Sequence, residues 1–159
     1  MKIRQFTREQ IPDVLDFEKH LREGEPFYSW DIGDTYVRAV ENSFSDPAFQ
    51  ASLSLLAYVD GKVVGRIDST IIASHFDGSK KAYLDWICVL KSHRHLGIAQ
   101  AMLGELLRIL RQRNIDTLIA LTAANEEAQR FYQSIPNSLM RDVGIWIDVP
   151  SSDACSNFQ

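Results

Sequence analysis

The feature that most constrains the fold is an apolar segment that runs into a glycine-containing turn and then into an amphipathic helix. The apolar segment, 83–89, predicts a buried strand, and the helix is expected over about 98–113. Because the turn holds Gly97, the first N–H groups of the helix are expected to form an anion site suited to phosphate. Gly97 has no Cβ and lets an anion approach the main chain, while Arg94 adds a charged guanidinium nearby.

Two other phosphate-binding motifs are absent from the sequence. The P-loop requires G-x-x-x-x-G-K-[ST] and the dinucleotide-binding turn requires G-x-G-x-x-G, and neither pattern occurs. The phosphate site is therefore expected on a different scaffold.

The chain before this centre predicts two helices and an antiparallel meander. Thr7 and Gln10 form a capping-box pattern, and Asp60-Gly61 is typical of a two-residue hairpin turn. The expected elements are a strand at 2–6, a helix capped by Thr7 that ends at Gly24 and Pro26, a loop at 23–34, a helix at 35–44, and strands at 53–59, 63–73 and 82–89.

The chain after the turn predicts a helix–strand–helix continuation. The core-facing stripe of helix 98–113 comprises Ile98, Met102, Leu103, Leu106, Leu107 and Leu110, with Asn114 as a left-handed stop. A strand at 116–122 should lie parallel to 82–89, because a helix connects them. A helix at 125–133, ended early by Pro136, follows. The expected order is completed by 138–140 and 144–149, as two short strands or one broken strand.

Composition and charge narrow the class of protein. A chain of 159 residues, 45% apolar and 24% charged, predicts a single soluble domain at 1–150 and a loose polar tail at 151–159. The net charge of −4 argues against nucleic-acid binding. Cys88 and Cys155 show no metal or disulfide spacing, and no signal peptide or membrane span is visible, so a cytoplasmic protein without a metal is expected.

Two motifs, in order, resemble those of the GNAT acetyltransferase superfamily. Arg94-x-x-Gly97-x-Ala99 is similar to the family's acyl-CoA-binding signature, and Asn125-x-x-Ala128-x-x-Phe131-Tyr132 is similar to its next helix. The resemblance implies an α/β (α+β) fold. Its sheet is mixed and mostly antiparallel, with a central, splayed parallel strand pair, and about four helices flank it.

The resemblance also implies how acetyl-CoA would be held as a co-substrate. In the family the pantetheine arm pairs with the end of the central strand, here the main chain of Ile87, Cys88 and Val89. The pyrophosphate would lie on the N–H groups of the turn, which comprises Arg94, His95, Leu96, Gly97, Ile98 and Ala99. Asn125 is equally well explained as a helix N-cap and as a residue that approaches the cofactor arm.

The implied catalytic residues are Tyr132 and Asp85. Tyr132 resembles the family's general acid, which protonates the departing thiolate, and the alternative is a core aromatic beside Phe131. Asp85 would deprotonate the amine, often through water. By strand alternation it is expected on the face of Ile87 and Val89. A structural role for Asp85 and a competing base at Asp68 both remain open.

The acceptor is less constrained than the cofactor. An N-acetyltransferase acting on a primary amine of a small molecule or peptide by direct attack is the leading interpretation, because no acid–base partner is placed beside Cys88 for a covalent path. A non-catalytic acyl-CoA-binding domain, a longer acyl group and an oxygen acceptor are the alternatives. Family members often form homodimers. An acidic aromatic pocket for the amine is hypothesised from Glu23, Glu25, Asp31, Asp34, Phe27, Tyr28 and Trp30.

Overall fold

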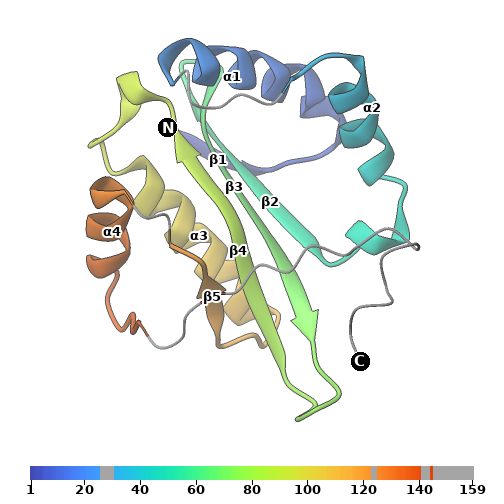
Figure 1. The fold of residues 1–159 in the computed structure, drawn as a ribbon, viewed down its shortest axis with the longest axis vertical. Coiled ribbons are helices and arrows are strands. Elements are labelled where there is room, and N and C mark those ends of the chain that lie inside the picture. Colours follow the sequence, from blue (N-terminus) through green and yellow to red (C-terminus); the bar gives the residue numbers. More distant parts are fainter. Residues whose placement is uncertain (26–30, 123–124, 141–143, 145–159) are drawn as a thin grey trace, which may run out of the picture. The chain divides into compact units, whose positions relative to one another are not determined.

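The structure, a computed structural model, describes residues 1–25, 31–122, 125–140 and 144. These residues form five strands, four α-helices and three short 3₁₀ helices (Figure 1). The strands are β1 (Lys2–Gln5), β2 (Ser52–Val59), β3 (Lys62–Ala73), β4 (Lys80–Val89) and β5 (Leu118–Ala120). The helices are η1 (Arg8–Gln10), α1 (Ile11–Gly24), α2 (Asp34–Ser43), η2 (Pro47–Phe49), η3 (Lys91–His93), α3 (Ile98–Gln112) and α4 (Glu126–Gln133). The chain divides into two compact units, Met1–Ala120 and Leu121–Gln159.

The first unit is built on one mixed sheet with the strand order β1-β2-β3-β4-β5. The first four strands pair antiparallel, and β5 pairs parallel with β4. Asp60 and Gly61 both have positive φ angles, 49° and 80°, as the predicted hairpin turn between β2 and β3 requires. The fold class predicted from the sequence, a mixed and mostly antiparallel sheet with one parallel strand pair and four helices, is confirmed. Among the described strands, the parallel pair β4–β5 lies at the edge of the sheet.

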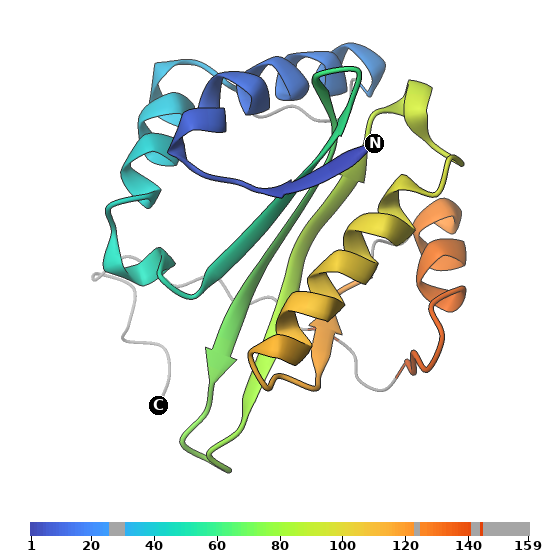
Figure 2. The same ribbon diagram turned by 180° about the vertical axis from the view of Figure 1, so that it is seen from behind.

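Helices cover both faces of this sheet. Gly65 on β3 faces α3, since a Cβ built there would lie 2.9 Å from Met102 Cε. The next residue, Arg66, reaches Glu18 on α1, so α1 lies on the opposite face. Figure 2 shows α3 running alongside β4 within this unit. The core on the α1 face includes Val14, Phe17, Leu21, Leu56, Tyr58, Val63 and Cys88.

Some predicted elements differ from the observed ones. The strand expected at 116–122 has only three residues, and the first helix starts with a 3₁₀ turn in which the Gln10 side chain accepts the Thr7 N–H at 2.8 Å. Ser138–Met140 is not a strand, because this stretch has no ladder partner among the described residues. The expected strand at 144–149, except for Gly144, and the tail at 151–159 lie outside the described residues.

The stripe predicted on α3 is wrong at one residue. Ile98, Met102, Leu103, Leu106 and Leu110 are buried, but Leu107 is 42% exposed. Leu107 follows Leu106 by about 100° around the helix, which turns it away from the sheet.

We expect Leu106→Ala to lower the free energy of unfolding by about 2–5 kcal/mol, because the fully buried side chain leaves a cavity. Leu107→Ala is the matched control and should change it by less than about 0.5 kcal/mol. Urea denaturation of both variants measures the difference, and equal losses would contradict this assignment of the α3 face.

Candidate functional site: the turn between β4 and α3

The turn between β4 and α3 leaves the helix N-terminus open. His95 and Gly97 have positive φ angles of 60° and 77°, and Gly97 is the N-cap residue of α3. The first hydrogen bond of the helix runs from Ala101 N to Gly97 O at 2.9 Å, so the N–H groups just after Gly97 have no carbonyl partner inside the helix. A Cβ at Gly97 would meet nothing within 4 Å. The turn therefore combines open space at Gly97 with a set of backbone donors at the positive end of a 15-residue helix.

The other residues of the turn differ in exposure. Ile98 is buried and anchors the helix, Ala99 is half-buried, and His95 and Leu96 are exposed, Leu96 by 68%. The main-chain N–H group is thus the donor that all residues of this turn have in common for a ligand. This agrees with a site in which the backbone, and not a set of side chains, contacts the anion.

The Arg94 side chain is engaged with the protein on two of its nitrogen atoms. Its Nε donates to the Val89 carbonyl at 3.1 Å, and its Nη2 forms an ion pair with Glu25 Oε1. Glu25 directly follows α1 and is buried. The sequence did not predict this pairing, which joins residues far apart in the chain.

The end of β4 extends beyond its parallel neighbour. The β4–β5 ladder consists of three pairs and ends at Leu84 and Ala120, whereas β4 continues to Val89. On its other side, β4 pairs with β3 as far as Val89 and Gly65. Over Ile87, Cys88 and Val89, β4 thus runs beyond the end of β5 and has no ladder partner on that side among the described residues.

The orientation predicted for Asp85 assumed regular alternation along β4, and this assumption is wrong. In the β3–β4 ladder, Asp68 pairs with Trp86 and Ser69 pairs with Leu84, so Asp85 is the extra residue of a β-bulge. Because regular alternation does not continue through a bulge, counting residues along β4 does not determine whether Asp85 lies on the face of Ile87 and Val89. Asp85 is exposed, Ile87 is half-buried and Val89 is buried.

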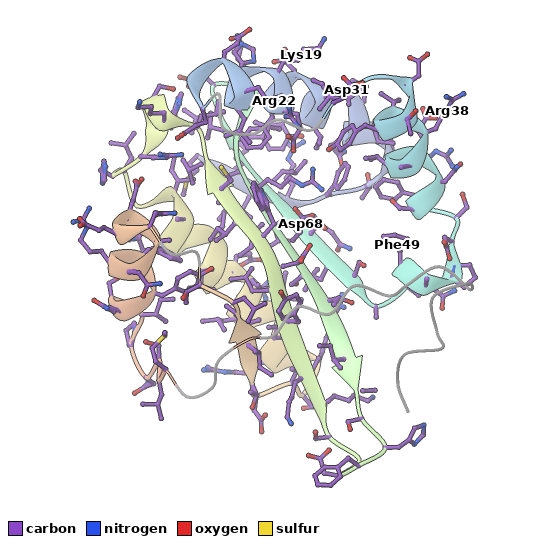
Figure 3. The ribbon with its side chains drawn as sticks, in the orientation of Figure 1. Lys19, Arg22, Asp31, Arg38, Phe49 and Asp68 are labelled. Carbon is purple, nitrogen blue, oxygen red and sulfur yellow. The ribbon has the colours of Figure 1, made fainter. Side chains whose placement is uncertain are left out.

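Buried charges lie on the α1 face of the sheet, and we call them the α1–β3 ionic cluster: Glu18, Arg22, Arg66 and Asp68. Glu18 contacts Arg22 Nη1 at 2.6 Å and Arg66 Nη1 at 3.3 Å, and Arg66 Nε lies 2.6 Å from Asp68 Oδ2. Figure 3 labels Arg22 on α1 and Asp68 on β3. Each carboxylate thus has a cationic partner, and the cluster fixes α1 to the sheet.

Burial and charge shift the pKa values in this cluster. Burial alone would lower the pKa of Arg66, but the charge and hydrogen bond of Asp68, together with Tyr36, outweigh it and raise this pKa. The pKa of the nearby Tyr36 hydroxyl is raised, first by burial and then by the charge of Glu18. Arg66 therefore stays charged and keeps Asp68 in a two-point ion pair, with a second contact of 3.1 Å from Nη2 to Oδ1.

The acidic aromatic pocket hypothesised for the acceptor is only partly described. Glu25 is paired with Arg94, so its charge is neutralised within the protein. Asp31 accepts the Gly33 N–H at 3.1 Å in the turn before α2. Phe27, Tyr28 and Trp30 lie outside the described residues.

The second unit carries the other motif. Asn125 is the N-cap of α4, and its Oδ1 accepts the Ala128 N–H at 2.8 Å, which confirms the predicted cap. The ring of the half-buried Tyr132 packs edge-to-face on Phe131, with 5.3 Å between ring centroids. Gln129 donates to Thr122 Oγ1 at 2.8 Å and ties the helix to the preceding chain.

The described residues show neither a candidate metal site nor a candidate membrane-spanning helix. They contain no group of three or more His, Cys, Asp or Glu side chains that could hold a metal ion. Within the same residues, no helix is both long and apolar enough to cross a membrane.

Comparison of the sequence with known protein families identifies the class of protein to which this fold and this turn belong. The sequence profile of the acetyltransferase (GNAT) family matches residues 15–135. The chain therefore belongs to the GNAT acetyltransferase family, and the predicted acyltransferase class is confirmed. No curated protein sequence matches the chain significantly.

Solved structures of acetyltransferases share the fold at low sequence identity. An aminoglycoside acetyltransferase, meta-AAC0020, from an uncultured soil metagenomic sample is 14% identical with a TM-score of 0.78, over 94% of this chain and 96% of that one. A ribosomal-protein-alanine N-acetyltransferase from Brucella melitensis biovar Abortus 2308 is 20% identical with a TM-score of 0.71, over 94% and 99%. AAC(6')-Iy, solved with a bisubstrate analogue of CoA and acetylneamine, is 19% identical with a TM-score of 0.73, over 94% and 98%.

Proposed function

We propose that this protein is an N-acetyltransferase that transfers the acetyl group of acetyl-CoA to a primary amine of a small molecule or peptide. The observation that carries the proposal is the open left-handed turn at Gly97, placed where β4 extends beyond β5. Family membership supplies the acyl donor, since GNAT enzymes use acetyl-CoA. Similarity to aminoglycoside and ribosomal-protein acetyltransferases supports an amine as the acceptor.

Acetyl-CoA would contact the main chain at two places. The N–H groups that follow Gly97 would bind the pyrophosphate, and the backbone of Ile87 and Val89 would pair with the pantetheine arm like an added strand. Two features favour this fit. Gly97, which has no Cβ and has open space around it, lies where the pyrophosphate would bind, and the end of β4, which has no β5 partner, lies where the pantetheine arm would bind. The thioester of the bound molecule supplies the activated acetyl group.

Acetyl transfer would proceed by direct attack in a ternary complex. The amine nitrogen attacks the thioester carbonyl, a C–N bond forms, and the C–S bond breaks. We assign to Asp85, exposed at the β4 bulge, the removal of the amine proton through water. Asp68 is less suited to this role because Arg66 holds both its oxygen atoms. Tyr132 would donate its hydroxyl proton to the departing thiolate.

Tyr132→Phe tests the acid role. With acetyl-CoA and a panel of aminoglycosides, polyamines and peptides, the wild type should release CoA thiol in an amine-dependent reaction. The variant should lower kcat by about 100-fold or more and leave the Kd for acetyl-CoA unchanged, because only the proton donor is lost.

Tyr58→Phe is the control for this prediction. It removes the hydroxyl that donates to Asp13 at 2.8 Å in the α1-face core, and kcat should stay within about twofold of wild type. Equal kcat values for Tyr132→Phe and wild type would refute the acid role. Binding of acetyl-CoA without any amine-dependent thiol release would favour the non-catalytic acyl-CoA-binding alternative.

A further inference from the structure

One guanidinium connects three segments of the first unit. Arg94 begins the turn to α3, its Nε donates to the carbonyl of Val89 at the end of β4, and its Nη2 pairs with Glu25 at the end of α1. Both side chains are largely removed from solvent, with 22% exposure for Arg94 and 11% for Glu25. A guanidinium held at two of its nitrogen atoms has little freedom to reorient, so the start of the turn is fixed relative to β4 and α1.

The buried carboxylate of Glu25 needs this partner. A buried charge without a counter-ion is strongly unfavourable, so the ion pair stabilises the positions of both the Glu25 and the Arg94 side chains. The left-handed residues His95 and Gly97 follow directly in the chain. The orientation of the N–H groups after Gly97 therefore depends on where the Arg94 side chain is anchored.

We propose that Glu25 is a positioning residue for the cofactor turn: it holds Arg94 against the end of β4 and thereby keeps the anion-binding N–H groups in place. The ligand in this inference, acetyl-CoA, rests on the proposed function. The role differs from direct phosphate binding by Arg94, which the sequence suggests. In that case Glu25 would compete with the phosphate for the same guanidinium.

The two roles predict opposite effects of Glu25→Gln on acetyl-CoA binding. If Glu25 positions the turn, loss of the charged anchor weakens binding. We expect the Kd to rise about tenfold, because one charge-assisted contact is lost. If Glu25 competes with phosphate, the same variant frees Arg94 and lowers the Kd. Glutamine keeps the size of the side chain and avoids a buried unpaired carboxylate, so the fold is retained.

Glu23→Gln is the matched control, because it removes the same charge from the same end of α1. Glu23 is exposed and lines a shallow depression together with Lys91 and Ser92, which precede the turn. Any general effect of lower negative charge on an anionic ligand appears in both variants. Calorimetric titration with acetyl-CoA should therefore show weaker binding for Glu25→Gln than for Glu23→Gln.

Hydrogen–deuterium exchange of the free protein tests the positioning role without a ligand. Amides in the 90–101 segment should exchange several-fold faster in Glu25→Gln than in wild type, and those of Glu23→Gln should match wild type. In a double-mutant cycle, Glu25→Gln should add no further loss of acetyl-CoA affinity to Arg94→Ala, because the anchor is already gone.

The outcomes separate this inference from the proposed function. Unchanged exchange in Glu25→Gln, or binding as tight as that of Glu23→Gln, overturns the positioning role. If the wild type binds no acyl-CoA, the proposed function fails, while faster exchange in Glu25→Gln still supports the anchor on the turn.

Discussion

Gly97→Glu is expected to abolish acetyl-CoA binding while the protein remains folded. The φ angle of 77° imposes a strain of about 1–3 kcal/mol on a side-chain-bearing residue, but a Cβ at this position meets nothing within 4 Å. The carboxylate would stand at the entrance to the helix N-terminus and repel the pyrophosphate. We expect the Kd for acetyl-CoA to rise at least 100-fold in a calorimetric titration.

Gly78→Glu supplies a control with the same backbone cost. Gly78 lies in the turn between β3 and β4, has a φ angle of 67°, and also has open space around a built Cβ. This variant should lose comparable stability and bind acetyl-CoA like the wild type. The anion site would be misplaced if Gly97→Glu bound normally, or if both variants lost binding equally.

Arg66→Met is expected to produce the largest loss of stability among single charge removals in the α1–β3 ionic cluster. It leaves Asp68 without its two-point partner and Glu18 with Arg22 as its remaining cationic partner among the described residues, in a region where all four side chains are mostly buried. Removal of one partner from a buried ion pair costs about 3–5 kcal/mol, so urea denaturation should give a loss of about 3 kcal/mol.

Arg108→Met is the surface counterpart of this change. Arg108 on α3 makes a two-point contact with Glu105, at 2.7 and 2.8 Å, but its side chain is 54% exposed. The loss there should be much smaller than that of Arg66→Met, because solvent screens an exposed ion pair. A similar loss for the two variants would contradict the structural importance assigned to the cluster.

Local sequence signals predicted most of the fold correctly. The hairpin at Asp60-Gly61, the left-handed stop at Asn114 and the Asn125 cap each depend on residues within one turn of the chain. The central strand, turn and α3 were also predictable, because strand length, glycine and amphipathic spacing all agree there.

The features that the sequence missed all depend on distant partners. The extra residue at Asp85 becomes visible only through its register with β3, and alternation along β4 alone cannot assign its face. The pairs Glu25–Arg94 and Glu18–Arg66 join α1 to residues much later in the chain. Leu107 fits the apolar spacing of α3, yet the width of the contact with the sheet leaves it exposed.

The measurement that tests the central claim most directly is calorimetric titration of the wild-type protein with acetyl-CoA. We expect binding with one site per chain, at the turn between β4 and α3, with a loss of affinity at higher salt because the pyrophosphate contacts are electrostatic. Absence of binding to acetyl-CoA and to longer acyl-CoA molecules would contradict the claim that this turn binds an acyl-CoA pyrophosphate.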